Sequence, residues 1–209
     1  MKKTLQIIFE NNKQKYPDFL KLVEKESSAT QWGIGIMSAY SIIPYYSEML
    51  GCKQGRMLKN ESTPGKNKQR YNLNNQGKII SETEFVNFNS RKNYWLTVKR
   101  FFAYKQNHIV EFCFSSASDH GIEAKLDFVK LAKTKDNLTV SCYMLNSDNE
   151  YTRLDYNYTN KRITTINQQM WLTENLVANR SYDLHHANTG VIITETLPDG
   201  NTYKIFPTK

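Results

Sequence analysis

The sequence predicts an α+β protein that is mainly β, with a short N-terminal helical head followed by an antiparallel β meander of about ten strands. Three observations support this prediction. Helical periodicity is confined to the start of the chain, strand-like segments follow one another from residue 70 onward, and the links between them are short and rich in Asn, Asp and Gly. Links this short join antiparallel neighbours, because a parallel crossover needs about a dozen residues or more. We expect a curved sheet or an open barrel.

The first part of the chain, residues 1–51, is expected to form a helical segment that packs on the sheet. Leu5, Ile8 and Phe9 have the spacing of one face of a helix. A second helix is expected to begin at the sequence YPD, residues 16–18, because proline fits a first helical turn and an acid suits the positive end of the helix dipole.

The rest of the head is less regular. The run 30–43 is ambiguous, because its glycines disfavour a helix while its apolar residues alternate as in a strand. Pro44 is expected to open a short helix that Gly51 closes. Residues 52–69 are polar and contain Gly and Pro, so we expect a loop there, which is the place for any domain boundary. One domain is expected overall.

Residues 70–209 are expected to form the meander. The expected strands are 69–73, 78–88, 93–104, 108–115, 121–132, 137–145, 150–158, 162–169, 181–185, 190–196 and 202–206. Apolar alternation drifts at the end of the strand over 121–132. Between 170 and 180 a turn of helix is expected to interrupt the strands.

Three stretches repeat one pattern: an aromatic-led strand, a turn, and a second strand. They are Tyr71, Leu73 and Gly77-Lys78-Ile79; Tyr156, Tyr158 and Arg162-Ile163; and Tyr182-Asp183-Leu184 with Gly190-Val191-Ile192. The pattern resembles the tyrosine–aspartate ("YD") hairpin repeats of bacterial Rhs-type proteins. The second copy lacks the glycine, the third has a longer turn, and the chain is too short for the long arrays of YD shells.

A second resemblance concerns function. With its 13 tyrosines, helical head and hairpin meander, the chain is similar to immunity proteins of bacterial polymorphic toxin systems. Such proteins are encoded beside a toxin and neutralise it by binding. The resemblance implies a cognate protein toxin as the partner.

The charge balance agrees with an acidic partner. With 28 basic and 20 acidic residues, the net charge of +8 favours an acidic protein surface, nucleic acid or anionic lipid. No stretch approaches the length of a membrane span, so a membrane is not expected as partner. Glu10 and Asn11 interrupt the apolar start before it resembles a secretion signal, and the three cysteines show no CxxC spacing. These features predict a soluble cytoplasmic protein.

The chain offers little that indicates catalysis. Its histidines, which are His108, His120, His185 and His186, lack metal-ligand spacing, and no phosphate-binding loop or nucleophile elbow occurs. Glu82 and Glu84 share one face of an expected strand and could form a general acid/base pair, although two such acids more often lie on the solvent-exposed side of a sheet. The adjacent Asp119 and His120 could form half of such a couple, but neighbouring side chains on an extended chain point apart. We therefore predict no catalytic residues, no metal, no cofactor and no enzymatic activity.

The leading hypothesis is thus a binding protein whose anchors are aromatic and cationic residues on strands. The anchors named from the sequence are Tyr94, Arg100, Tyr104, Tyr151, Arg153 and Tyr156. One alternative is a nucleic-acid-binding protein, because the run 91–105 interleaves cations with aromatic rings. Another is a small-ligand-binding β barrel, which a pocket with converging polar groups would favour.

Overall fold

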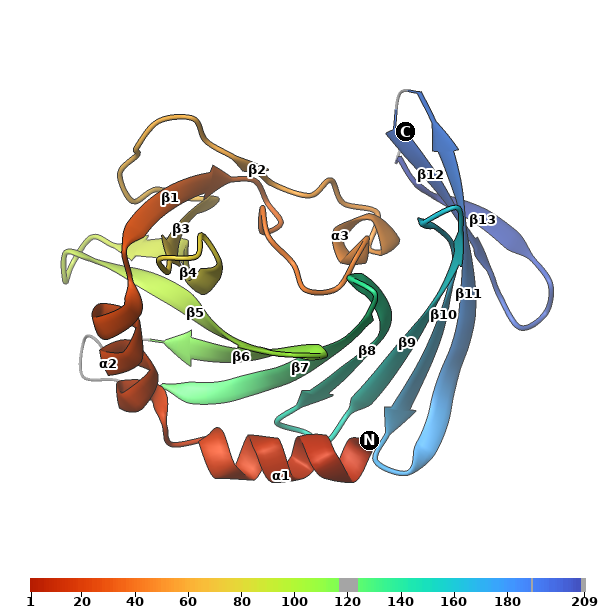
Figure 1. Cartoon of the computed structure of the whole chain (residues 1–209), viewed down its shortest axis with the longest axis horizontal. Helices are drawn as coiled ribbons and strands as arrows, with labels where there is room; N and C mark the ends of the chain where they lie inside the picture. The colour runs from red at the N-terminus through yellow and green to blue at the C-terminus, as the bar shows by residue number, and fades with distance from the viewer. Residues whose placement is uncertain (117–123, 189, 208–209) are drawn as a thin grey trace.

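The computed structural model describes residues 1–116, 124–188 and 190–207 and shows short helices followed by an open antiparallel meander (Figure 1). The helices in this part are α1 (Lys2–Asn12), α2 (Tyr16–Glu26) and α3 (Tyr46–Met49). The strands are β1 (Ala29–Ile34), β2 (Arg56–Met57), β3 (Lys68–Leu73), β4 (Ile79–Asn89), β5 (Tyr94–Lys105), β6 (His108–Ser116), β7 (Lys125–Lys135), β8 (Leu138–Asn146), β9 (Tyr151–Thr159), β10 (Arg162–Leu172), β11 (Asn175–Ala187), β12 (Gly190–Thr196) and β13 (Thr202–Phe206). The predicted fold class is confirmed.

The described strands form one sheet of 13, in the order β13 down to β3, then β1 and β2. The order does not return on itself, so the sheet is open, with β13 and β2 as its edges. The described sheet has more strands than the ten or so expected. Two of them come from segments where no strand was assigned: β1 lies in the N-terminal segment 1–51, and β2 lies in the expected loop 52–69. The run 30–43, which was ambiguous between helix and strand, begins as the strand β1. Its Trp32 is buried, and the Trp32 ring stacks on that of Phe85, with centroids 5.8 Å apart.

The predicted helical turn between 170 and 180 is wrong. β10 continues to Leu172 and β11 begins at Asn175, and the two residues pair directly across the hairpin. Thr173, in the turn, has a φ of 54°. Pairing between β10 and β11 provides hydrogen-bond partners for the backbone N–H and C=O groups of this segment. This pairing outweighs the apolar spacing that had suggested a helical turn.

The drift in the apolar pattern of β7 is a β-bulge. Leu126 pairs with Phe114 and Phe128 pairs with Cys113, so Asp127 is the extra residue between them. A bulge moves the following side chains to the other face. The predicted beginning of this strand, 121–123, lies outside the described residues.

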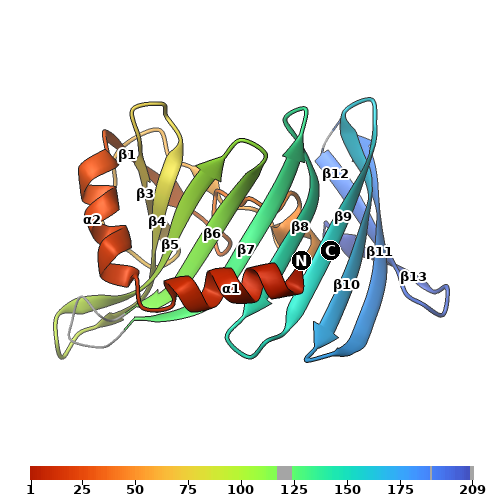
Figure 2. The same ribbon diagram turned by 60° about the horizontal axis from the view of Figure 1, so that its bottom comes forward.

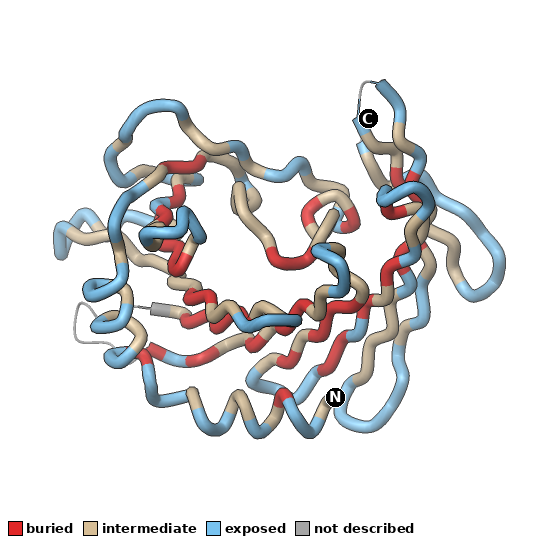
Figure 3. Tube along the Cα trace, in the orientation of Figure 1, coloured by how far each residue is buried: buried red, intermediate tan, exposed pale blue. Residues whose placement is uncertain are grey.

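The sheet is strongly curved, and the helical head covers its convex face (Figure 1). α1 and α2 pack there on a cluster of buried side chains. Figure 3 colours the buried residues red, and many of them lie along the middle strands. Phe19 of α2 stacks on Phe101, with ring centroids 5.0 Å apart, and contacts Phe112 at 4.8 Å. Aromatic side chains bury the largest apolar area per residue, so they fix these helices on the strands.

The concave face is covered instead by residues 35–55, which we call the strap (Figure 1). Apart from α3, the strap has no helix or strand. Its Ile42, Ile43 and Met49 are buried against strand residues such as Leu154 and Ile166. The predicted short helix after Pro44 is therefore present, and it packs inside the curve of the sheet.

Hairpin turns alternate between the two ends of the strands, which we call the upper and lower rims as they stand in Figure 2. The upper rim carries the turns β3–β4, β5–β6, β7–β8, β9–β10 and β11–β12. The lower rim carries β4–β5, β8–β9, β10–β11 and β12–β13, with the β6–β7 connection lying partly outside the described residues. No helix in the described part of the chain is long and apolar enough to cross a membrane.

Candidate functional site

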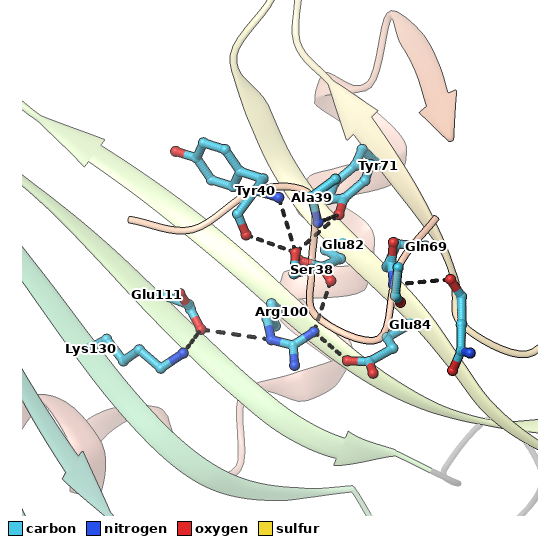
Figure 4. Close-up of polar contacts among 12 residues, drawn as sticks. Ser38, Ala39, Tyr40, Gln69, Tyr71, Glu82, Glu84, Arg100, Glu111 and Lys130 are labelled. Carbon is cyan, nitrogen blue, oxygen red and sulfur yellow. Dashed lines mark hydrogen bonds and ion pairs between the residues drawn. The ribbon is translucent and has the colours of Figure 1, made fainter. Parts of the chain in front are cut away.

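The strap is fastened to the sheet by polar side chains that point from the strands into the concave face (Figure 4). Ser38 Oγ lies 2.9 Å from Glu82 Oε2 and 3.0 Å from Tyr71 Oη. The backbone N–H of Ala39 donates to Tyr71 Oη at 3.0 Å, and Gln69 Nε2 donates to the carbonyl of Gly35 at 3.0 Å. Strand side chains thus satisfy backbone groups that an irregular segment cannot satisfy itself.

Below the strap lies a cluster of charged residues from the four adjacent strands β4 to β7 (Figure 4). Arg100 Nη1 donates to Glu82 at 2.9 Å and to Glu84 at 2.8 Å. Glu111 accepts a 2.6 Å hydrogen bond from Lys130 Nζ and lies 3.8 Å from Arg100 Nε. Buried charges are tolerated when they are paired and hydrogen-bonded in this way.

The cluster has more carboxylates than cations. Burial raises the pKa of Glu82 to about 7, although Arg100 and the Ser38 hydroxyl partly counteract this. When Glu82 carries a proton, Glu84 and Glu111 balance the two cations. The expectation that Glu82 and Glu84 form the wet side of a sheet is wrong, since the Glu82 side chain is fully buried.

Beside this cluster, the strap and the sheet enclose a cleft of about 140 Å³. It is lined by Ser38, Tyr40, Tyr46, Glu84, Arg100, Glu111 and Lys130, among others. A carboxyl group that titrates near neutrality lies next to it. Because the charged groups bind one another, the arrangement holds the strap in place and makes its attachment sensitive to pH.

The sequence did not indicate that Glu111 and Lys130 belong with Arg100. Each lies on a different strand, and no local motif joins them. The signal available was the alternation of single charges among apolar residues on β6 and β7, at positions where a sheet residue faces the core.

Three of the predicted anchors lie on the concave face and are engaged within the protein. Arg100 belongs to the charged cluster. Tyr104 Oη donates to the carbonyl of Ile79 at 2.8 Å. Tyr156 is buried, with its hydroxyl 3.5 Å from the Pro44 carbonyl. Arg100 and Tyr156 thus help to hold the strap, and a role for either residue as a partner anchor stays a prediction.

The other three predicted anchors lie elsewhere. Tyr151 is buried on the convex face, where its ring is 5.2 Å from that of Trp171. Arg153 is exposed on that face and pairs with Asp155 at 2.7 Å. Tyr94 is half-buried at the lower rim. The six residues therefore form no common surface, because alternate strand positions point to opposite faces.

The run 91–105 is divided in the same way. Arg91 and Lys92 are exposed at the lower rim and Lys105 at the upper rim, whereas Phe101 and Phe102 are buried on opposite faces. The rings and cations of this run are therefore distributed over two rims and two faces, with Tyr94 and Trp95 near Arg91 and Lys92 at the lower rim, and the nucleic-acid alternative stays a prediction.

The three described histidines differ in their surroundings. His108 and His186 are half-buried, and His186 Nε2 lies 2.7 Å from the Ile163 carbonyl. His185 is exposed, and His120 lies outside the described residues. Among the residues that the structure describes, no group of three or more His, Cys, Asp or Glu side chains is placed to hold a metal ion.

The tyrosines of the three YD-like stretches share one location. Each stretch forms a hairpin, namely β3–β4, β9–β10 and β11–β12. Their leading residues Tyr71, Tyr156 and Tyr182 are all buried on the concave side. Two of the hydroxyls hold the strap, and that of Tyr182 donates to Gln168 at 2.6 Å.

The surplus of positive charge gathers on the upper rim. The described residues of its turns, together with the three strand residues on either side of each turn, carry six cations and one acid, Asp136. The cations, which we call the basic rim, are Lys78, Lys105, Lys133, Lys135, Lys161 and Arg162. All are exposed except the half-buried Lys133. Counted in the same way, the hairpins β4–β5, β8–β9, β10–β11 and β12–β13 of the lower rim carry four cations and five acids: Arg91, Lys92, Arg153, Lys204, Asp148, Glu150, Glu174, Glu195 and Asp199.

No known protein family matches the sequence, and no curated protein matches it. Among solved structures, the chain is similar to a porin-like protein from Bacteroides uniformis, with 11% sequence identity and a TM-score of 0.45. The similarity covers 66% of this chain and 51% of that protein, so the chain spans about half its length. A likeness at this level carries no argument about function.

Proposed function

We propose that the protein is a non-enzymatic binding protein, namely an immunity protein that neutralises a cognate bacterial toxin by direct contact in the cytoplasm. The observation that supports this proposal is the basic rim, where four hairpins bring six cations to one edge of the molecule. An acidic face of a protein toxin complements such an edge. Complementary potentials steer association and disfavour wrong partners.

The turns of the basic rim hold these cations in defined positions. Asn160 and Lys161 have positive φ values of 50° and 63°, and Asp136 and Asn137 have 52° and 62°. Two successive residues with positive φ are typical of the tight turns that match the twist of paired strands. Little loop ordering is then needed on binding, which favours affinity.

Nucleic acid is the alternative partner for a basic edge. The run 91–105 is divided over two rims and two faces, and Tyr104 is its ring at the basic rim, where Lys78 Nζ already lies 5.3 Å from the ring centroid. An acidic protein surface requires charge complementarity alone. The protein partner is therefore the proposal, and nucleic acid is an outcome of its test.

The experiment is co-expression with the protein encoded by the adjacent gene, which the proposal expects to be the toxin, followed by measurement of affinity between the purified proteins. We expect the wild-type protein to restore growth of cells that express the toxin. The double variant Lys161→Glu/Arg162→Glu should weaken toxin binding by about tenfold or more and lose the protection, because like charges then face each other.

The matched control is Arg91→Glu/Lys92→Glu, which reverses an adjacent pair of exposed cations in a turn of the lower rim. This variant should bind the toxin as the wild type does. Equal weakening by both variants, or no binding by the wild type, contradicts the proposal. Binding of an oligonucleotide that falls steeply with salt and is lost only in the upper-rim variant would favour the nucleic-acid alternative.

A further inference from the structure

A second cavity lies under α3 on the concave face and shares Tyr46 with the cleft beside the charged cluster. It has a volume of about 340 Å³ and lies between α3 and the strands β7 to β11 (Figure 1). Its apolar lining includes Met49, Phe128, Met144 and Met170. We call it the methionine pocket. Cavities that bind small molecules have volumes from about 300 Å³ upward and are mainly apolar with a few polar groups.

The walls suit an apolar ligand of adaptable shape. Methionine side chains are flexible and polarisable, so they fit irregular apolar groups. Two large apolar residues of the lining, Leu50 and Leu172, are 56% and 44% exposed. A ligand that covers these exposed apolar side chains removes their surface from water, and this burial favours binding.

Polar groups converge on one side of the methionine pocket, and they offer donors. Tyr182 Oη donates to Gln168 Oε1 at 2.6 Å, which orients the amide. No described residue accepts a hydrogen bond from Gln168 Nε2. An oxygen acceptor on a ligand would satisfy it.

Arg180 supplies a positive charge beside that amide. Its Nη1 lies 3.1 Å from Glu195 Oε1, yet that oxygen accepts no hydrogen bond from a described residue. A guanidinium has five N–H donors, so Arg180 retains donors for a second carboxylate. Arg100 in the same protein binds Glu82 and Glu84 together.

We propose that the methionine pocket binds a small amphipathic carboxylate, with the apolar body against the methionines and the carboxylate against Arg180 and Gln168. The net charge of +8 favours an anionic ligand of this kind. The site is separate from the proposed toxin contact, because its lining reaches the lower-rim residues Asn146, Glu150 and Leu172, while the basic rim lies at the opposite ends of the strands.

The test is a fluorescence titration with cis-parinarate, a polyene fatty acid, against the purified full chain. We expect saturable binding at one site and competition by dodecanoate. Arg180→Gln should raise the Kd for cis-parinarate by about tenfold, because a charge-assisted hydrogen bond is lost. The matched control is Arg153→Gln, an arginine with similar exposure and its own carboxylate partner on the convex face.

A second pair of variants keeps the test independent of the arginine. Leu172→Glu adds a negative charge to the pocket lining and should also weaken binding by about tenfold. Leu176→Glu changes an equally exposed leucine on the next strand, outside the lining, and should have no effect. Absence of saturable binding, or equal effects within either pair of variants, overturns the proposal. Neither result bears on the toxin proposal, since no toxin is present in the assay.

Discussion

The two faces of the sheet bury their residues by different means. On the convex face, two regular helices cover an apolar cluster rich in aromatic rings. On the concave face, the irregular strap covers an apolar cluster together with charged residues such as Glu82 and Arg100. Helices satisfy their own backbone, whereas a strap needs partners for its N–H and C=O groups. The concave face therefore carries polar side chains because the irregular strap that covers it needs hydrogen-bond partners for its backbone.

The largest effect is expected on the convex face. Phe114→Ala removes a ring with no exposed surface from the cluster under α2 and should lower the free energy of unfolding by about 4 kcal/mol. Denaturant unfolding measures the loss. Since no charged group takes part, the loss should be the same at pH 5 and pH 8. A loss that varies with pH would break the contrast between the faces.

The concave face is expected to respond to pH through Glu82. Its pKa is raised from 4.5 to about 7 in the folded state, so the folded protein holds this proton more tightly than the unfolded chain. Its contribution to stability is complete below about pH 4.5 and is lost as pH rises to about 7, by about 3 kcal/mol.

The measurement is the difference in unfolding free energy between wild type and Glu82→Gln across that pH range. The variant cannot titrate at this position, so the wild type should lose stability relative to it as pH rises. Glu24→Gln, at an exposed position on α2, is the control and should show a flat difference. A flat difference for Glu82→Gln would remove the pH sensitivity assigned to the concave cluster.

A smaller effect distinguishes tyrosines on the two faces. Tyr71→Phe keeps the ring but leaves the Ala39 N–H without its partner, and should lower the unfolding free energy by about 2 kcal/mol. Tyr143→Phe is the matched change on the convex face, where no hydrogen bond to a described residue is lost, and should cost less than about 0.5 kcal/mol. Thermal unfolding of the two variants compares them, and equal losses would show that the hydroxyl does not hold the strap.

The smallest effect is expected for an exposed ion pair. Arg153→Gln removes the partner of Asp155 on the convex face and should change stability by about 0.5 kcal/mol or less. Denaturant titration in low and high salt should show that even this difference disappears when charges are screened. A loss above about 2 kcal/mol would place Arg153 among the structurally important charges, together with Arg100.

Several elements could be placed from local sequence alone. The strand expected over 202–206 is β13 itself, and the one expected over 190–196 is β12. The strand expected over 108–115 differs from β6 by one residue. Turn residues such as Gly77, with a φ of 71°, act within a few positions and need no distant partner. Local chemistry of this kind can be read without the rest of the fold.

Other features required contacts between distant segments. The hairpin at 173–174 and the strand β1 depend on a neighbouring strand that accepts their hydrogen bonds. The assignment of Tyr151 and Tyr156 to opposite cores depends on the register of β9, and a shift of one residue would exchange the faces.

The sequence by itself determined the number and order of most strands and their antiparallel pairing, because period-two alternation and turn chemistry act over a few residues. Only the tertiary structure decided which cations share a rim and which charges become buried. Glu82, Arg100 and Lys130 are far apart in the chain, and the registers of the adjacent strands β4 to β7 bring them into one cluster, since Glu82 pairs with Arg100 and Glu111 pairs with Lys130. Burial and pairing are properties of that arrangement, so no single segment of the sequence contains them.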